Sequence, residues 1–252
     1  MKLSILIPVL NYEERLEKTI RKIKQIVKNQ EIIILYDVTN LDMKKKAIEI
    51  SRILKRKYKT KTIFRFNEKG FGSALRKGFE IAKGDFIVVM MGDFSDDPNT
   101  IPKMIEKARE GYDIVVGSRY MKGGRIIGNT LKQRISHLFS LLINIFSKVK
   151  CRDITNAFKL YKKDVLKTVK TKSKSFDISC EITLKAARKG FKISEVPTIW
   201  KNRVFGKSNF KMIKESKNYF KWFLFSVFIM PSKITKIIVL LLFLFFLYLI
   251  II

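Results

Sequence analysis

The sequence predicts an α/β protein with a mostly parallel sheet covered by helices, followed by a membrane helix at the C-terminus. Two observations support this class. Continuous apolar runs of strand length alternate with segments of helical periodicity, which is typical of a sheet buried on both faces. Every residue from Ile237 to Ile252 is apolar, which favours a segment in lipid over a core helix.

The apolar runs and the periodicity place the individual elements. The first expected helix carries Leu16, Ile20, Ile23 and Val27 at intervals of three and four residues. We expect strands over residues 2–9, 31–36, 61–66, 85–91 and 112–117, and helices over residues 12–28, 44–56, 72–82 and 101–110.

Three polar side chains follow the expected strands. Asn11, Asp37 and Asp93 stand at or just after the ends of the first, second and fourth strands. Ligands of such sheets bind beyond the carboxyl ends of the strands. The sequence therefore predicts that these residues converge on one rim.

Composition limits the chemistry. The 252 residues include 52 Lys and Arg against 22 Asp and Glu, a net charge of +30, which indicates an anionic partner such as phosphate groups, an acidic membrane or nucleic acid. Two cysteines and one histidine exclude a disulfide framework and a Cys/His zinc cluster. His137 lies in an apolar-periodic stretch and is interpreted as structural. Carboxylates, basic side chains and the backbone must carry the chemistry.

The C-terminal part divides into two predicted segments after a domain of residues 1–211. Residues 212–233 combine aromatic side chains with lysines and favour a helix in the membrane interface, or a first membrane helix cut short at Pro231. Residues 234–252 are predicted to be a transmembrane anchor, whose sixteen apolar residues span about 24 Å of a roughly 30 Å core. Lysines precede the anchor and no charge follows it, which predicts a cytoplasmic catalytic domain.

The strongest candidate for chemistry is Asp93. It leaves the fourth strand through Gly92 and precedes Ser95, Asp96 and Asp97. A carboxylate at a strand end can hold Mg²⁺ or Mn²⁺ while a diphosphate completes the coordination shell. Asp97, which precedes a proline, is better interpreted as a helix cap.

Other phosphate-binding candidates are weaker alone. Asp37 could accept hydrogen bonds from a nucleobase or ribose, or it could cap the next turn. Residues 69–74 (KGFGSA) open a helix with two glycines and resemble a phosphate-binding turn without its full spacing. Arg119, Arg134 and Arg203 are candidates for bidentate phosphate contact.

Taken together, these motifs resemble the inverting family 2 glycosyltransferases, and in particular the dolichol-phosphate mannosyltransferase and polyprenyl-phosphate glycosyltransferase group. The resemblance covers residues 3–211. It rests on IPVLN with Glu13 and Glu14 (residues 7–14), Asp37, GFGSA (70–74), DFSDDP (93–98), GSRY (117–120), DITNAFK (153–159), EVP (195–197) and RVFGKS (203–208).

The resemblance implies a GT-A type, Rossmann-like fold and assigns roles to residues. Donor binding falls on Pro8, Asn11, Glu13, Asp37, Lys69, Gly70, Gly92 and Asp93. The metal, Mg²⁺ or Mn²⁺, falls on Asp93 and Ser95. Acceptor binding falls on Arg119, Arg134, Asp153 and Ser208, and catalysis on Asp93, Arg119, Arg134 and Arg203.

The implied reaction transfers a sugar from a nucleotide diphosphate to a polyprenyl phosphate with inversion. A phosphate monoester is already anionic at neutral pH and needs no strong base, which agrees with the scarcity of histidine. A family member that glycosylates a hydroxyl would need a carboxylate base such as Asp96 or Asp97.

Three departures from the family pattern leave a non-catalytic membrane scaffold open as an alternative. Met91 replaces the first metal aspartate, Tyr36 replaces the first acid of the strand-two pair, and Asn209 replaces a lysine. A nucleic-acid-binding protein is disfavoured because the lysines are scattered and no recognition motif is present. A homo-oligomer is left open.

Overall fold

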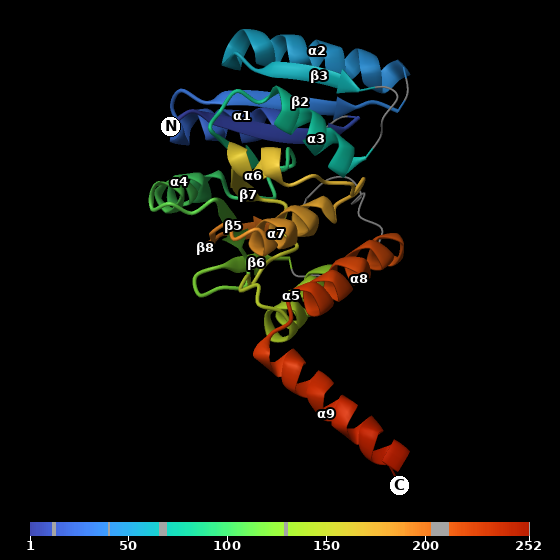
Figure 1. The fold of residues 1–252 in the computed structure, drawn as a ribbon. Coiled ribbons are helices and arrows are strands. Elements are labelled where there is room, and N and C mark those ends of the chain that lie inside the picture. The colour runs from blue at the N-terminus through green and yellow to red at the C-terminus, as the bar shows by residue number, and fades with distance from the viewer. Residues whose placement is uncertain (12–13, 40, 66–69, 129–130, 203–211, 252) are drawn as a thin grey trace.

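The computed structural model describes residues 1–11, 14–39, 41–65, 70–128, 131–202 and 212–251. Over these residues the chain forms a seven-stranded sheet of order β3-β2-β1-β4-β7-β5-β8 and a two-stranded sheet of β6 and β9 (Figure 1). The strands are β1 Leu3–Leu10, β2 Glu31–Asp37, β3 Lys61–Arg65, β4 Phe86–Val89, β5 Ile114–Ser118, β6 Arg125–Ile127, β7 Lys159–Lys162, β8 Ile193–Pro197 and β9 Ile199–Lys201.

The large sheet is mostly parallel, as expected. Strands β3, β2, β1 and β4 run parallel to one another, and β5 is parallel to β8. Strand β7 runs antiparallel between β4 and β5. The five predicted strands are all present, with ends that differ from the prediction by one or two residues.

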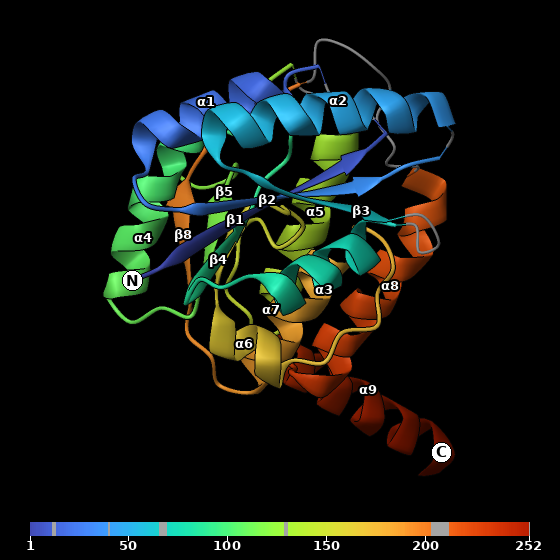
Figure 2. The same cartoon turned by 90° about the horizontal axis from the view of Figure 1, so that it is seen from above.

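Helices cover both faces of this sheet. The helices of the described residues are α1 Leu16–Ile26, α2 Leu41–Tyr58, α3 Phe71–Ile81, α4 Ile101–Arg109, α5 Leu131–Phe146, α6 Lys163–Thr168, α7 Ile178–Arg188, α8 Met212–Ile229 and α9 Lys233–Ile251, with a 3₁₀ turn at Pro98–Thr100. In Figure 2, α1, α2 and α4 lie on one side of the sheet, and α3, α6 and α7 lie on the other.

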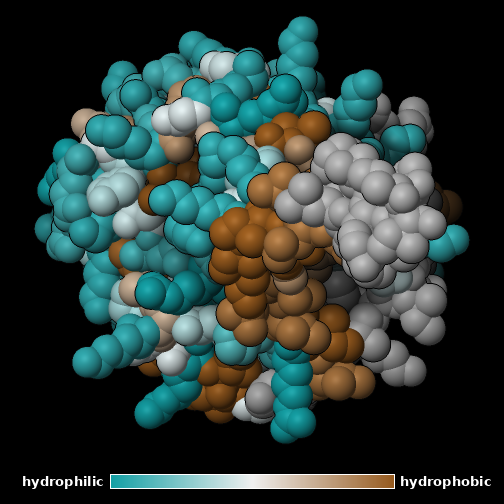
Figure 3. All heavy atoms as spheres, turned by 60° about the horizontal axis from the view of Figure 1, so that its bottom comes forward, coloured by the Kyte–Doolittle hydropathy of each residue, from teal (hydrophilic) through white to brown (hydrophobic). Residues whose placement is uncertain are grey.

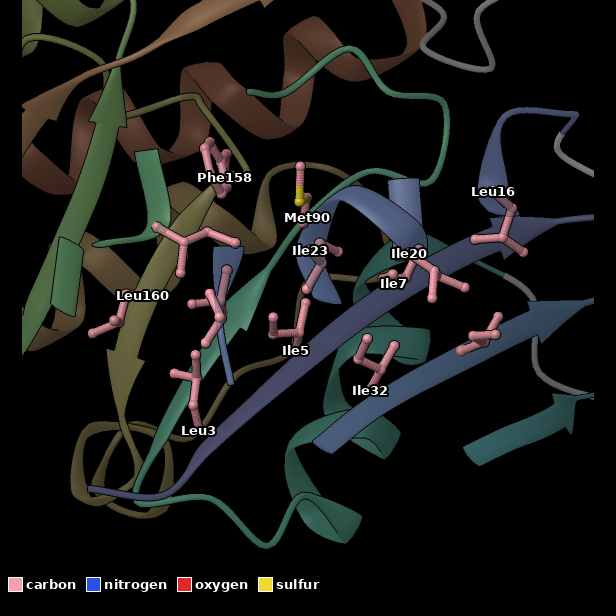
Figure 4. Close-up of a cluster of buried hydrophobic side chains, with 14 of the residues drawn as sticks. Leu3, Ile5, Ile7, Leu16, Ile20, Ile23, Ile32, Met90, Phe158 and Leu160 are labelled. Carbon is pink, nitrogen blue, oxygen red and sulfur yellow. The ribbon is translucent and has the colours of Figure 1, made fainter. Parts of the chain in front are cut away.

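Alternation along the strands divides the core between these faces. Ile5 and Ile7 of β1 pack in one buried cluster with Ile20 and Ile23 of α1, as Figure 4 shows. Leu6, between them, packs on the other face with side chains of α3. Because successive side chains of a strand point to opposite faces, one continuous apolar strand fills both layers.

The C-terminal helices pack on the far end of the domain. Helix α8 contacts α5 and α7 and buries Trp222 in the core, and α9 then extends away from the body (Figure 1). Among the helices of the described residues, none is both long and apolar enough to cross a membrane. The membrane helix expected over residues 234–252 is therefore not supported by the described chain.

Candidate active site

The rim at the carboxyl ends of β1 and β2 is fixed by Asn11. This residue has a left-handed backbone, with φ of 61°. Its N–H donates to the carbonyl oxygen of Asp37 at 2.8 Å, and its Oδ1 accepts from the N–H and the hydroxyl of Thr39 at 2.8 and 2.7 Å. The predicted convergence of Asn11 and Asp37 is confirmed, and the side-chain oxygen of Asn11 is used to join two strand ends.

Asp37 is held on two sides by the protein. Its Oδ1 lies 3.2 Å from Nη1 of Arg65, and its Oδ2 accepts the N–H of Gly70 at 3.0 Å. Arg65 also donates to the hydroxyl of Ser73 at 2.7 Å, and both charged side chains are buried. Arg65 was not among the predicted site residues. The pair joins the ends of β2 and β3 to the start of α3.

The glycines of the 70–73 turn serve a close backbone approach. A Cβ on Gly72 would lie 2.3 Å from the carbonyl oxygen of Ser173, and one on Gly70 would lie 2.5 Å from that of Lys174. The N–H of Gly72 donates to the same Lys174 oxygen at 3.0 Å. Since the N–H groups of Gly70 and Gly72 both have protein partners, the phosphate-binding interpretation of this turn lacks support from these two groups.

Asp93 and Ser95 lie together in a tight loop after β4. Oδ1 of Asp93 accepts the N–H of Ser95 at 3.0 Å, and both residues are buried. Phe94 between them takes a left-handed backbone with φ of 60°, and the N–H of Lys201 in β9 donates to the carbonyl oxygen of Ser95 at 2.8 Å. Strand β9 therefore fixes the Asp93 loop, which was predicted to hold a metal, through a backbone hydrogen bond.

Asp96 is a second buried carboxylate in this loop. Its Oδ2 accepts the N–H of Met91 at 3.0 Å. Burial raises the pKa of Asp96 to about 7, against the lowering effect of this hydrogen bond, and the charge of Asp93 adds to the increase. Asp97, in contrast, accepts the N–H of Asn99 at 3.0 Å and caps the 3₁₀ turn, which confirms its interpretation as a cap.

The donor set of this loop fits a hard divalent cation in part. Asp93, Asp96 and Ser95 offer oxygen, which Mg²⁺ and Mn²⁺ prefer, whereas the thioether of Met91 is a poor ligand for them. The described residues contain no group of three or more His, Cys, Asp and Glu arranged to hold a metal. The two neighbouring buried carboxylates suit a cation whose remaining ligands are phosphate and water, because its charge would offset their desolvation.

Arg119, directly after β5, and Asp153, in the segment before β7, lie near enough to Asp96 of this loop for their charges to affect its pKa. Nε of Arg119 lies 2.7 Å from Oδ2 of Asp153, and Nη2 lies 2.8 Å from Oδ1. Burial alone would lower the pKa of Arg119, but the charge of Asp153 outweighs burial and raises that pKa above its ordinary value. Two of the four predicted acceptor residues, Arg119 and Asp153, are thus brought together as partners of each other.

The segment that carries Asp153 is anchored from two directions. Glu195 of β8 accepts the N–H groups of Arg152 and Asp153 at 2.9 and 3.1 Å. Lys159 is fully buried and donates to the carbonyl oxygen of Ile154 at 2.8 Å. No role had been assigned to either residue, although Glu195 and Lys159 belong to the EVP and DITNAFK motifs quoted above.

The remaining predicted residues are dispersed. Pro8 is buried within β1, Gly92 packs against Ile7 and Leu16, and Arg134 is exposed on α5. Tyr36, at the position of a family acid, is buried in the core and stacks on Phe64 with ring centres 5.5 Å apart. The predicted residues Glu13, Lys69, Arg203 and Ser208 lie outside the described residues.

A mostly parallel sheet with an acidic loop at its carboxyl rim and a basic side chain near that loop is consistent with a GT-A-like fold. Residues 4–170 match the model of Glycosyl transferase family 2. The chain belongs to this family.

Two curated relatives share most of this chain. The dolichol-phosphate mannosyltransferase of Pyrococcus furiosus is 32% identical over 233 residues, which cover 88% of this chain and 64% of the relative. The undecaprenyl-phosphate mannosyltransferase of Micrococcus luteus is 27% identical over 219 residues, which cover 82% of this chain and 87% of the relative. The chain thus spans somewhat less than two thirds of the first relative and most of the second.

Solved structures confirm the α/β, GT-A-like part of the fold expected from the sequence. Glucosyl-3-phosphoglycerate synthase of Mycobacterium tuberculosis, in complex with Mn²⁺, UDP-glucose and phosphoglyceric acid, superposes with a TM-score of 0.64 at 17% identity. The match covers 92% of this chain and 81% of that one. The similarity establishes the GT-A-like α/β architecture.

Proposed function

We propose that this protein is an inverting glycosyltransferase that moves a sugar from a nucleotide diphosphate to a polyprenyl phosphate. The observation that carries the proposal is that the acidic Asp93 loop and the Arg119–Asp153 ion pair lie near each other on one rim of the sheet. Arg119, directly after β5, and Asp153, in the segment before β7, lie near enough to Asp96 in the Asp93 loop for their charges to affect its pKa. A donor diphosphate and an acceptor phosphate need sites of this kind next to each other. The names of both curated relatives specify a polyprenyl-type phosphate.

On the donor side, the buried Asp93 loop would hold the diphosphate through a divalent ion. Asp93, with Ser95 and Asp96, would supply the protein ligands. Mg²⁺ or Mn²⁺ supplies positive charge that stabilises the departing nucleotide diphosphate. Asp37, fixed by Arg65 and Gly70, lies at the end of β2, which β1 separates from β4, and a nucleoside would bind at this rim in this type of sheet.

On the acceptor side, Arg119 orients the lipid phosphate. A phosphate monoester is already a nucleophile at neutral pH, so positioning and charge supply the rate in place of a strong base. Asp153 holds the guanidinium at two points, and the phosphate would share its remaining N–H edge. Arg134, exposed on the first turn of α5, adds positive charge for an approaching anion.

The membrane enters the proposal through the acceptor and the C-terminal segment. A polyprenyl chain resides in lipid, and the run of apolar residues from Ile237 suits attachment there. Lysines before that run favour a catalytic domain on the cytoplasmic side.

A second candidate is transfer to a hydroxyl group, favoured by the position of Asp96. This buried carboxylate lies beside Asp93 on the same rim, where a base would be needed. A third is a non-catalytic scaffold, favoured by Met91 and by Tyr36, which is packed in the core in place of an acid.

One experiment separates the three. The purified full chain is incubated with Mn²⁺ or Mg²⁺, a panel of nucleotide sugars and polyprenyl phosphate, and sugar-linked lipid is measured. We expect transfer that is lost in Asp93→Ala and kept in the matched control Asp97→Ser, which retains a capping side chain. Donor binding without turnover identifies the scaffold, and transfer only to a hydroxyl that is lost in Asp96→Asn identifies the second candidate.

A further inference from the structure

Thr19 places a fully buried hydroxyl on the apolar face of α1. It lies in the stripe that Leu16, Ile20 and Ile23 bury in the core. Valine would fit the same space without a polar atom, so a hydroxyl at this position needs a hydrogen-bond partner to offset its burial. Oγ1 of Thr19 donates to the carbonyl oxygen of Gly92, in the loop after β4, at 2.9 Å.

The same hydroxyl also has an acceptor within its own helix. Its Oγ1 lies 3.1 Å from the carbonyl oxygen of Arg15, one turn earlier. Such a local contact is common for serine and threonine in helices, and Ser51 of α2 makes it with the carbonyl oxygen of Ala47 at 2.6 Å. The bond to Gly92 distinguishes Thr19, because it leaves the helix and reaches the loop that carries Asp93.

The bond to Gly92 acts on the backbone that leads directly into Asp93. The carbonyl group of Gly92 and the N–H of Asp93 belong to one planar peptide unit, so a bond to the oxygen fixes the direction in which the chain enters Asp93. The glycine itself is closely packed, since a Cβ there would lie 3.2 Å from Cγ2 of Ile7 and 3.3 Å from Cδ1 of Leu16. The peptide unit before Asp93 is therefore held against β1 and α1.

The next residue of the loop is strained and has partners on two sides. Phe94 takes a left-handed backbone, with φ of 60°, which residues other than glycine rarely adopt. Nζ of Lys18, the neighbour of Thr19 on α1, lies 4.7 Å from the centre of the Phe94 ring, a cation–π contact. From the other side, the N–H of Lys201 in β9 holds the carbonyl oxygen of Ser95. A strained turn persists only where its surroundings fix it at several points, and α1 supplies two of them.

Met91 explains why this loop needs support from α1. Its thioether is a poor ligand for a hard cation and stands where the family pattern has a carboxylate. Fewer bonds between the protein and the ion are then available to order the loop when the ion binds. Contacts that order the loop beforehand reduce the entropy cost of binding.

We propose that Thr19 is a positioning residue, whose hydroxyl sets the Asp93 loop in the geometry that receives the divalent ion and the donor diphosphate. The nature of this ligand rests on the proposed function. The dependence of the loop geometry on Thr19 follows from the contacts alone, so the two parts can be tested separately.

Hydrogen exchange in the protein without ligands tests the loop geometry. The N–H groups of Met91 and Ser95 each donate to a carboxylate of the loop at 3.0 Å, so their exchange rates, measured by NMR, report whether the loop is formed. Thr19→Val keeps the shape of the side chain and removes the donor to Gly92. We expect both amide groups to exchange roughly tenfold faster in this variant, because a buried acceptor has lost its partner.

Two further variants separate positioning from a general loss of structure. Thr19→Ser keeps the hydroxyl and should keep slow exchange. Ser51→Ala removes a buried helix hydroxyl that does not reach the loop, and should leave the loop amide groups unchanged. Amide groups of β2 should stay protected in all variants. Figure 3 shows a contiguous apolar area on the end of the molecule formed by the last helices, so every protein is kept in the same mild detergent.

Ligand measurements then connect the loop to its function. Thr19→Val should weaken Mn²⁺ binding several-fold, with the free ion counted by electron paramagnetic resonance. It should raise the KM for the nucleotide sugar by a similar factor and leave the KM for polyprenyl phosphate unchanged, and Thr19→Ser should restore both values.

Two results would overturn the inference. One is loop exchange that is the same in Thr19→Val and the unmodified protein, and the other is an equal rise of both KM values, which would indicate a general loss of structure. Faster loop exchange in Thr19→Val, when even the unmodified protein binds neither Mn²⁺ nor a nucleotide sugar, would instead refute the proposed function and support the role of Thr19 in the loop.

Discussion

Arg119 and Asp153 form a two-point ion pair, with Nε 2.7 Å from Oδ2 and Nη2 2.8 Å from Oδ1, between the end of β5 and the segment before β7. Both side chains are buried. Asp153→Asn should lower the free energy of unfolding by about 3 kcal/mol, because it leaves a buried guanidinium without its counter-charge. Urea unfolding of the two proteins measures the difference.

The exposed pair of Lys77 and Glu80 is the control for this prediction. Its charges are 2.8 Å apart but both side chains are about half exposed or more. Glu80→Gln should cost about 0.5 kcal/mol or less, since solvent screens the pair. Equal costs for Asp153→Asn and Glu80→Gln would contradict a special role for the buried pair.

Met91 offers a gain-of-function prediction at the proposed metal loop. Met91→Asp restores a second acid of the family pattern beside Asp93. It should strengthen Mn²⁺ binding by about tenfold, because one more carboxylate adds at least about 1.4 kcal/mol of attraction to the ion. Without metal, the variant should melt at a lower temperature because the carboxylates repel one another.

Thermal unfolding with and without Mn²⁺ checks both effects, and Met91→Leu is the apolar control. An unchanged Mn²⁺ response in Met91→Asp would show that the Asp93 loop is not the metal site.

Gly72 is predicted to tolerate no side chain. A Cβ there would lie 2.3 Å from the carbonyl oxygen of Ser173, a backbone atom that cannot move aside alone. Gly72→Ala should destabilise the protein by about 1–3 kcal/mol, the usual cost of overpacking, and should raise the KM for the donor because the turn supports Asp37. Gly190→Asn is the control, since nothing lies within 4 Å of its Cβ and asparagine tolerates the left-handed backbone.

We predict that Glu181 stabilises the folded protein at neutral pH and that acid removes this contribution. Burial would raise its pKa, but hydrogen bonds from Lys185 and from the N–H groups of Ser173 and Lys172 outweigh burial and lower it below the ordinary 4.5. A carboxyl group whose pKa is lowered in the folded state stabilises the protein above about pH 4.5. This contribution disappears as the pH falls through the folded-state pKa.

Glu181→Gln should therefore cost about 1–2 kcal/mol at neutral pH, and the difference from the unmodified protein should shrink in acid. Urea unfolding across that range tests the sign. A difference that grows in acid would contradict the assignment.

The fold was readable from the sequence where strands are long and apolar. The runs in β1 and β2 are buried on both faces, so their composition alone identified them. Strand β7 reads KLYK and carries no such run; its central position and antiparallel direction come from pairing with β4 and β5. Strands β6 and β9 have three residues each and gave no signal of their own.

The sequence could predict the parts of the site whose interactions form between residues close together in the chain. Asp93, Ser95 and Asp97 adopt local roles within one loop that their spacing could predict. The partners of Asp37 and Asp153 were not predictable, because each pairs with one arginine among 52 basic residues, and only the folded sheet selects Arg65 and Arg119.

Trp222 links helix α8 to the segment that supports the Gly72 turn. Its Nε1 donates to Oδ2 of Asp177 at 2.9 Å, and the same oxygen accepts the hydroxyl of Ser173 at 2.5 Å. The carbonyl oxygens of Ser173 and of the next residue contact the Gly72 turn. Trp222→Phe keeps an apolar ring but removes the donor, and should destabilise the protein by about 1–3 kcal/mol because a buried carboxylate loses a hydrogen bond.

The same variant should weaken donor binding several-fold, because the segment that supports the turn is released from α8. Titration of a nucleotide sugar with Mn²⁺ measures the affinity, and Phe223→Leu, a half-buried aromatic on the same helix without a polar partner, is the matched control. If both variants lose stability but only Trp222→Phe loses donor affinity, the hydrogen bond transmits the position of α8 to the rim. Equal losses of donor affinity in the two variants would show that α8 acts on the rim only through packing.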